Sequence, residues 1–238
     1  QIKKGEIYGL VGESGSGKST VARCIMNIYK PSEGEIFYKG IPICKSKEFR
    51  KNRKMLQMTR QMIFQDSASS LNPRMKIGDI VAEPLRIYSG KGRPGKKEIE
   101  KQLELVGLDR SYMEKYPCEL SGGQRQRVAI ARALSTKPEL IVADEPIASL
   151  DVSIQAQMVN LFRKLQKEQG FSFLFIAHDL SMVEFLCDRT GVMYHGKLVE
   201  EGRTQDIFAH PEHEYTKALL AAVPIPDPRI ERQKGEVL

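Results

Sequence analysis

The chain has 238 residues, is 41% hydrophobic, and carries a formal net charge of +7 with a pI near 9.2. This length suits one large domain, or one domain with an insertion, and the composition supports a full hydrophobic core. The basic excess, concentrated in residues 45–60 and 91–97, fits a nucleic-acid or anionic-membrane partner, and equally a solvated basic face. No apolar run approaches the roughly 20 residues that a membrane helix needs, and the first residues do not resemble a signal peptide. We therefore expect a chain that does not cross a membrane by itself.

The four cysteines are scattered and form no CxxC pair; they are Cys24, Cys44, Cys118 and Cys187. Neither a disulfide framework nor a cysteine metal site is indicated. Buried thiols in a reducing cytoplasm are the expectation.

Strand and helix patterns alternate along most of the chain. Strands are predicted at 6–11, 34–39, 61–64, 140–143, 171–177 and 190–194, and helices at 19–29, 77–87, 96–106, 154–168 and 179–186. This alternation predicts an α/β fold with a mostly parallel sheet flanked by helices. Residues 68–133 show helical pattern only and are predicted to form an inserted helical subdomain. The proline-rich tail 223–238 is expected to be extended or poorly ordered.

The segment "GESGSGKST" follows the first predicted strand and opens a helix, and it fits the pattern G-x-x-x-x-G-K-[ST]. Glycines in such a loop let successive backbone amides point at phosphate oxygens, and the helix N-terminus favours an anion. The lysine would reach the terminal phosphates and the serine hydroxyl would bind Mg²⁺. We predict a nucleoside triphosphate site formed by Gly12, Glu13, Ser14, Gly15, Ser16, Gly17, Lys18, Ser19 and Thr20, with Lys18 also catalytic.

Two acids follow the buried strand in "LIVADEP". The carboxyl end of a parallel strand is where open α/β sheets bind their ligands. Asp144 is predicted to join Ser19 in holding Mg²⁺, because this ion prefers carboxylate and water oxygens. Glu145 is predicted to be the general base that activates the attacking water.

Two further polar residues stand just beyond predicted strands. His178 follows the strand in "FLFIAHDL" and should emerge at the same sheet edge as the acid pair, in reach of a γ-phosphate. Gln65 in "MIFQD" ends a short strand where the helical middle begins, and is predicted to contact both ATP and Mg²⁺ or its water. A lone histidine after a strand is more often structural, so its role depends on that shared edge.

The segment "LSGGQ" at 120–124 resembles the signature motif of the ATP-binding cassette (ABC) ATPases, and the other motifs follow in that family's order over nearly the whole chain. The resemblance implies a P-loop NTPase cassette in which two subunits enclose two ATP molecules head to tail. Ser121, Gly122, Gly123 and Gln124 would then contact the ATP of the partner subunit. Asp151, in "ASLD", would communicate between the two sites across the dimer.

Several stretches resemble the ATP-binding subunits of bacterial oligopeptide and dipeptide importers, a group that includes nickel importers. They are "DEPIASLDVSIQAQ", "AHDLSMVEFLCDR", "YHGKLVEEG" and the tail "HPEHEYTKALLAAVPIPDP", with "PIPDPRIE" closest to the oligopeptide type. The resemblance implies an ATPase at the cytoplasmic face of a membrane, paired with a second, more often different, ATPase subunit. It also implies permease subunits, an extracytoplasmic binding protein and no nucleic-acid partner.

The same resemblance divides the chain into three parts. Residues 1–67 and 134–210 form the ATP-binding core, 68–133 the helical signature subdomain, and 211–238 a C-terminal extension. Residues 66–75 and 77–85 are candidates for the surface that docks on the permease. The alternative is that they only pack the helical subdomain, and the family resemblance favours docking.

Other functions are compatible with parts of the sequence. A nickel importer ATPase differs only in substrate, which the sequence does not reveal. A soluble ABC ATPase acting on nucleic acid or ribosomes would suit the basic charge, but only 102 residues separate Lys18 from Ser121, without a heptad run, and there is one cassette. A kinase-like reaction leaves "LSGGQ" unexplained, and the complete set of motif residues disfavours an inactive module.

Family members carry an aromatic residue that stacks on adenine well before the phosphate loop, whereas only eleven residues precede Gly12 here. Tyr8 is on the strand leading into the loop, too near to serve. We therefore expect a chain shortened at both ends, without the adenine platform and without a cysteine-bearing C-terminal extension. Stacking on an aromatic ring contributes about 1–3 kcal/mol per base, so ATP affinity should be roughly 5- to 150-fold weaker without it.

Overall fold

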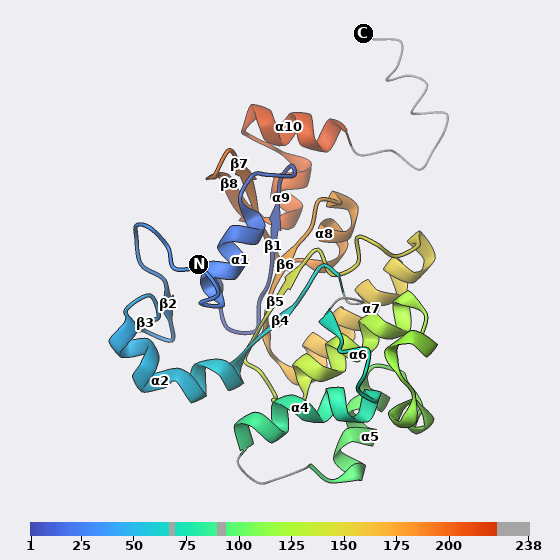
Figure 1. Cartoon of the computed structure of the whole chain (residues 1–238). Coiled ribbons are helices and arrows are strands. Elements are labelled where there is room, and N and C mark those ends of the chain that lie inside the picture. Colours follow the sequence, from blue (N-terminus) through green and yellow to red (C-terminus); the bar gives the residue numbers. More distant parts are fainter. Residues whose placement is uncertain (67–69, 90–93, 223–238) are drawn as a thin grey trace.

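The computed structural model describes residues 1–66, 70–89 and 94–222, and its centre is a six-stranded sheet (Figure 1). Its strands lie in the order β4-β5-β6-β1-β7-β8. They are β1 (Ile7–Val11), β4 (Arg60–Ile63), β5 (Leu140–Asp144), β6 (Ser172–Ile176), β7 (Arg189–Tyr194) and β8 (Lys197–Arg203). All neighbours pair in parallel except β7 and β8. The predicted mostly parallel α/β sheet is confirmed.

Both faces of the sheet are apolar, because successive side chains of a strand point to opposite sides. In β6, Phe173 and Phe175 join one hydrophobic cluster, and Leu174 and Ile176 join the other. Phe162 packs on the first face, with its ring centroid 5.2 Å from that of Phe173. The buried strands therefore read as continuous apolar runs in the sequence.

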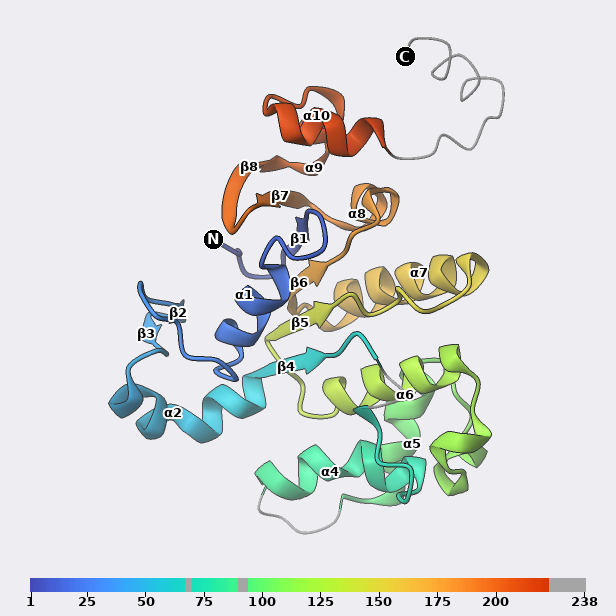
Figure 2. The same ribbon diagram turned by 45° about the horizontal axis from the view of Figure 1, so that its top comes forward.

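Helices cover the two faces (Figure 2). On one side lie α1 (Lys18–Ile25) and α2 (Ser46–Thr59), and on the other α7 (Val152–Gln169) and α8 (Leu180–Leu186). Helix α1 buries Ala22 against the sheet and α2 buries Leu56.

The described residues of the middle of the chain form helices joined by turns, with no strand among them, as the helical pattern predicted. It comprises α4 (Ile77–Ser89), α5 (Lys96–Leu105), the 3-10 turns η1 (Arg110–Glu114) and η2 (Pro117–Glu119), and α6 (Gly122–Leu134). Val81, Leu103 and Ile130 are fully buried where these helices meet. Their apolar faces continue the core beneath α7, so this part packs as an insertion on one face of the sheet.

The C-terminal part turns back over the end of the sheet. Strand β8 forms a hairpin with β7, and then α9 (Thr204–Ala209) and α10 (Glu214–Ala221) follow. Figure 1 places α10 above β7 and β8, at the same end of the molecule as the start of α1. The prediction for residues 223–238 lies outside the described residues.

Several local predictions were wrong. The strand predicted at 34–39 shrinks to β2 (Phe37–Tyr38), which pairs with β3 (Ile41–Pro42) in a small separate hairpin. The turn between them ends at Gly40, whose φ is +78°. The antiparallel β8 was missed, whereas the basic stretch 45–60, for which a mixture of helix and loop was expected, forms α2 over most of its length.

The cysteine prediction was partly wrong. All four thiols are free, as expected, but only Cys187 is buried. Cys118 is exposed, and Cys24 and Cys44 are half-buried. Cys118 lies in the 3-10 turn η2, of which only Pro117 is buried. The presence of a cysteine therefore did not indicate burial.

No helix in the described portions of the chain combines the length and apolarity needed to span a bilayer.

Candidate functional site

The glycine-rich loop connects β1 to α1 and turns sharply at three glycines. Gly12, Gly15 and Gly17 have φ values of +147°, +82° and +105°, in the region that side chains disfavour. A Cβ on Gly12 would lie 2.1 Å from the Met193 carbonyl oxygen, whereas one on Gly15 would meet no atom within 4 Å. The loop is thus pressed against β7 at its start and open to solvent at its crown, which fits a backbone cradle for phosphate oxygens.

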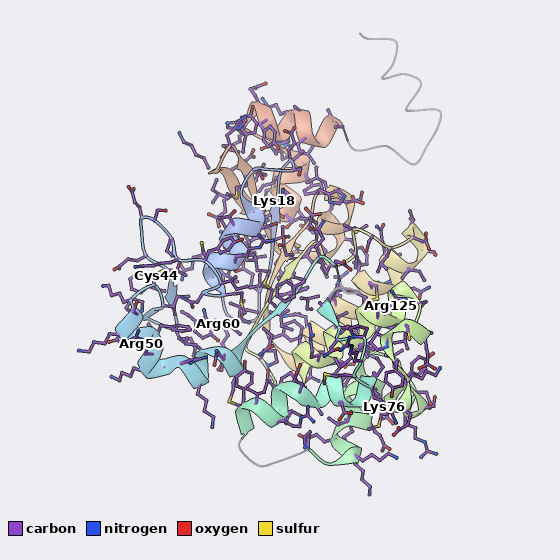
Figure 3. The ribbon with its side chains drawn as sticks, in the orientation of Figure 1. Lys18, Cys44, Arg50, Arg60, Lys76 and Arg125 are labelled. Atoms are coloured by element: carbon purple, nitrogen blue, oxygen red, sulfur yellow. The ribbon has the colours of Figure 1, made fainter. Side chains whose placement is uncertain are left out.

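Lys18 begins α1 and folds back into this loop (Figure 3). Its side chain is buried, and Nζ donates hydrogen bonds to the carbonyl oxygens of Gly12 at 2.7 Å and Glu13 at 2.8 Å. Burial lowers the pKa of Lys18, while the carboxylates of Glu145 and Asp144 act in the opposite direction. A cation held inside the loop and facing two acids matches a group that neutralises phosphate charge.

The remaining predicted loop residues differ in exposure. Glu13, Ser14, Gly15 and Thr20 are exposed, Ser16 is buried, and Gly17 and Ser19 are half-buried. The chain therefore presents the crown of the loop, rather than its base, to a ligand.

Ser19 and Asp144 meet at the first turn of α1. Ser19 Oγ donates a 2.8 Å hydrogen bond to Asp144 Oδ1, although 125 residues separate them. Asp144 ends β5 and is buried. A hydroxyl and a carboxylate side by side beside the phosphate loop are the oxygen donors that Mg²⁺ uses when substrate and water complete its shell, so these residues fit the ion.

Glu145 is the centre of a second polar cluster. Its Oε2 accepts a 3.2 Å hydrogen bond from Gln65 Nε2 and lies 3.2 Å from His178 Nδ1. Its φ of +45° is left-handed, which is unusual for glutamate, and its amide donates to the Ile176 carbonyl at 3.0 Å. The ends of β4, β5 and β6 thus bring Gln65, Glu145 and His178 together. The meeting of His178 with the acid pair was expected from the sequence, whereas the contact between Gln65 and Glu145 was not.

The segment 121–124 begins α6 and is arranged as a capped helix terminus. Ser121 Oγ accepts from the Gln124 amide, and Gln124 Oε1 accepts from the Ser121 amide at 3.0 Å. Ser121 and Gly122 are exposed. A Cβ on Gly123 would lie 2.9 Å from Ile154 Cγ2, so glycine is required for close packing on α7.

Figures 1 and 2 both place α6 on the far side of β4 and β5 from α1. Within the described ranges, no hydrogen bond or ion pair joins residues 121–124 to the phosphate loop. One chain therefore does not assemble these two groups into a single site. Asp151 begins α7 without capping it through its side chain, and the next residue, Val152, is 81% exposed.

A groove of about 810 Å³ runs between α1, α2 and β4 on one side and α4 on the other. Exposed apolar side chains stand along it, among them Ile28, Phe64 and Ile87. The apolar residues of the two segments considered for docking mostly face inward, with Leu71, Ile77 and Val81 buried. Residues of both segments nevertheless line the groove, among them Ser70 and Pro84.

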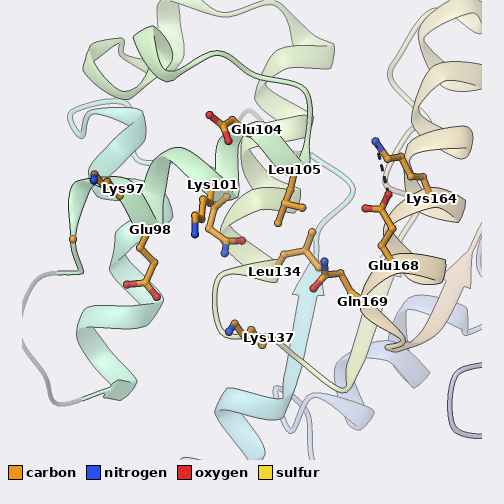
Figure 4. Close-up of a pocket in the computed structure, with 12 residues that line it drawn as sticks. Lys97, Glu98, Lys101, Glu104, Leu105, Leu134, Lys137, Lys164, Glu168 and Gln169 are labelled. Carbon is orange, nitrogen blue, oxygen red and sulfur yellow. Dashed lines mark ion pairs between the residues drawn. The ribbon is translucent and has the colours of Figure 1, made fainter.

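A second hollow, of about 830 Å³, is lined by residues of α5, α6, α7 and the turn after α6 (Figure 4). Its lining carries lysines and glutamates together, including Lys101, Lys137 and Lys164, and Lys164 lies 3.9 Å from Glu168. None of the phosphate-loop residues lines it. Its mixed charge does not favour a particular ligand.

The comparisons with known proteins agree with this geometry. Residues 1–148 match the family model described as "ABC transporter", and residues 199–238 match "Oligopeptide/dipeptide transporter, C-terminal region". The chain belongs to the ABC transporter family. Among curated proteins it is 53% identical to the oligopeptide transport ATP-binding protein OppF of Bacillus subtilis, over 98% of this chain and 77% of that protein.

Other relatives and solved structures are similar. The dipeptide transport ATP-binding protein DppF of Lactococcus lactis is 49% identical, over 100% of this chain and 77% of that protein. The ATP-binding cassette MJ0796, solved as a post-hydrolysis dimer bound to ADP and Pi, superposes with a TM-score of 0.75 at 31% identity, over 86% of this chain and 88% of that one. CbiO1 of Clostridium perfringens, part of the transporter complex cbiONQ, gives 0.76 at 29%, over 99% and 89%.

One residue that contacts the loop was not predicted from the sequence. Tyr215, in α10, accepts a 2.9 Å hydrogen bond from the Glu13 amide. The only signal available was its place in "HEYT", within the segment that resembled the importer extension. Tyr8, by contrast, is buried in the sheet and is placed as expected.

Proposed function

We propose that this chain is the ATP-binding and ATP-hydrolysing subunit that energises a membrane importer of oligopeptides or dipeptides. The observation that carries the proposal is that Lys18, Asp144 and Glu145 lie close together at one edge of the sheet. They come from the start of α1 and the end of β5, which are far apart in sequence. The printed names of the relatives supply the transported class. The family-model match to residues 199–238 supports peptides over nickel.

In this proposal, the loop amides and Lys18 bind the phosphates of ATP, and Ser19, Asp144 and Gln65 hold Mg²⁺. The ion neutralises phosphate charge when bound. Glu145 accepts a proton from water, whose oxygen attacks the γ-phosphorus while the bond to the ADP oxygen breaks. His178 and Gln65 both contact Glu145 through the same oxygen, Oε2, and His178 would also reach the γ-phosphate.

The exposed Ser121–Gln124 terminus is proposed to complete the site of a partner cassette. Its serine hydroxyl, its glycine amides and the positive end of the α6 dipole all favour an anion. Because Ser121 and Val152 are exposed on elements that touch through Gly123 and Ile154, they outline one continuous face. We place Asp151 on this dimer face, and a related but different ATPase subunit is the partner that we expect.

Permease subunits are proposed to dock in the groove beside Phe64. An apolar groove bordered by Ile28 and Ile87 is suited to an amphipathic helix. Gln65 lies next to Phe64 and bonds to Glu145, so a partner in the groove is linked to the catalytic carboxylate through two adjacent residues. In this scheme residues 1–67 and 134–210 hydrolyse ATP, 68–133 carry the signature, and 211–238 form the extension.

The basic helix α2 supports a location at the cytoplasmic face of the membrane. Arg50 projects outward from it (Figure 3), and Lys47, Lys51, Arg53 and Lys54 are also exposed. Because α2 borders the groove, a permease in the groove would bring these cations toward anionic headgroups, which attract them by about 1 kcal/mol each.

The test is reconstitution with the permease subunits, a partner ATPase and a binding protein in vesicles, with labelled oligopeptide, dipeptide and Ni²⁺ supplied separately. We expect ATP-dependent peptide uptake that Lys18→Ala abolishes. Uptake of Ni²⁺ alone would favour the nickel alternative. ATP hydrolysis stimulated by nucleic acid or ribosomes, without uptake, would overturn the proposal in favour of a soluble ATPase.

A further inference from the structure

The phosphate loop is held from outside by the C-terminal helix. Tyr215 in the first turn of α10 reaches the loop, where its Oη accepts the 2.9 Å hydrogen bond from the Glu13 amide. These residues are 202 positions apart. Glu13 is the second residue of the loop, immediately before the exposed crown at Ser14 and Gly15. A hydrogen bond at this point therefore restrains the loop where it leaves the sheet.

The ring of Tyr215 is itself fixed by stacking. Its centroid lies 4.0 Å from that of Tyr194, with an interplanar angle of 28°. The His195 ring also packs on Tyr194, with the two ring centroids 4.2 Å apart. Aromatic pairs of this kind contribute beyond the area they bury, so the hydroxyl of Tyr215 is held in a defined position rather than on a mobile side chain.

The end of β7 and the turn that follows it also contact the loop directly. The Gly196 amide donates a 3.0 Å hydrogen bond to the Ser16 carbonyl, and the Met193 carbonyl borders Gly12. The end of β7, the β7–β8 turn and α10 thus contact the loop at Gly12, Glu13 and Ser16. Ser14 and Gly15, at the crown of the loop, are exposed.

The start of α10 is anchored to the sheet by Glu200 of β8. Its carboxylate accepts from the amides of Glu212 at 2.9 Å and His213 at 3.0 Å, and His213 Nδ1 accepts from the Tyr215 amide at 3.1 Å. Burial raises the pKa of Glu200, but the hydrogen bonds from the Glu212 amide, the Thr216 side chain and the His213 amide outweigh it and lower the pKa overall. This pair of charge-assisted hydrogen bonds at the N-terminus of α10 fixes the position of the helix on the sheet, and therefore the position of Tyr215.

We propose that Tyr215 is a positioning residue for ATP binding: its phenol oxygen holds the Glu13 amide and keeps the phosphate loop in its binding shape. Through it, the C-terminal region that follows β8 sets the ATP affinity of the loop. A loop ordered before binding loses less conformational entropy when the phosphates arrive. This inference rests on the proposed ATP-binding function, and it assigns the C-terminal region a part in that function.

The experiment compares Tyr215→Phe with Tyr194→Phe in the purified chain. Both variants lose one phenol hydroxyl from the same stack and keep both rings, but only the first loses the bond to Glu13. Hydrogen–deuterium exchange at the Glu13 amide reports the contact itself. Titration with ATP and Mg²⁺, and steady-state hydrolysis, report its consequence.

We expect faster exchange at Glu13 and about two- to tenfold weaker ATP binding in Tyr215→Phe, the range of one ordinary hydrogen bond. The KM for ATP should rise by the same factor with kcat unchanged, since saturating ATP restores the loop. Tyr194→Phe should match the wild type, and both variants should unfold at nearly the wild-type temperature.

Two results would overturn the inference, and they are distinguishable. Unchanged exchange and affinity in Tyr215→Phe, or equal losses in Tyr194→Phe, would overturn the positioning role and leave the proposed function intact. A wild-type chain that binds no ATP would overturn the proposed function, and this inference with it.

Discussion

Glu145 Oε2 and His178 Nδ1 lie 3.2 Å apart, although 33 residues separate them in sequence. Their strands are neighbours: β5 pairs with β6 in register from Leu140 opposite Ser172 to Asp144 opposite Ile176. Each residue therefore stands just beyond the same edge. The contact therefore links the proposed general base, Glu145, to the residue that follows the adjacent strand.

Replacing Glu145 by glutamine removes the carboxylate that accepts the proton, while its size and its neighbours remain. We expect hydrolysis to fall about 100- to 10,000-fold, the usual contribution of a general base. ATP binding should persist, so light scattering should detect an ATP-dependent rise in mass if the chain pairs with itself. Lys18→Ala in the same background should remove that rise. Hydrolysis at wild-type rate would exclude Glu145 as the base.

Gly12→Ala should impair ATP binding through the backbone. Its Cβ would lie 2.1 Å from the Met193 carbonyl oxygen, so the loop must move. Strain of about 1–3 kcal/mol corresponds to roughly 5- to 150-fold in affinity. Gly34→Ala is the matched control, because its φ is also positive, at +78°, but its Cβ meets open space outside the loop. Isothermal titration with ATP should separate the two; equal affinities would contradict the steric argument.

Ile87→Glu and Val152→Glu place a charge on two different exposed apolar residues, 65% and 81% exposed. The first should abolish co-purification with the permease and leave ATP-dependent pairing of Glu145→Gln subunits intact. The second should do the reverse, because Val152 adjoins Asp151 on the proposed dimer face. Both should keep the wild-type unfolding temperature, since neither side chain is part of the core. If both variants fail in the same assay, the two surfaces have been assigned wrongly.

Phe173→Ala should destabilise the fold at the centre of the sheet. The Phe173 side chain is fully buried and contacts the rings of Phe162, Phe171 and Phe175. Truncation of such a residue costs about 3–5 kcal/mol. Urea unfolding followed by circular dichroism measures it. Phe173→Leu keeps most of the volume and should cost clearly less; similar losses for both variants would indicate that the aromatic contacts matter more than the cavity.

The sequence by itself determined the sheet and its chemistry. Buried strands such as 140–144 are recognisable because both faces are apolar, and the glycine-rich loop is recognisable because its backbone shape requires glycine at fixed positions. Parallel strands place their carboxyl ends at one edge, so Asp144, Glu145 and His178 were expected to meet there. These are local rules, and local rules can be applied to a sequence.

Only the tertiary structure decided what depends on contacts between distant segments. For residues 45–60 the sequence predicted only a mixture of helix and loop, and the structure decided the extent of α2, which buries Leu56. The antiparallel β8 depends on its partner β7. The bond from Glu13 to Tyr215 arises because α10 folds back across the end of the sheet, and no spacing in the chain encodes that approach. Such contacts are set by packing of the whole molecule, which is why they appear only in three dimensions.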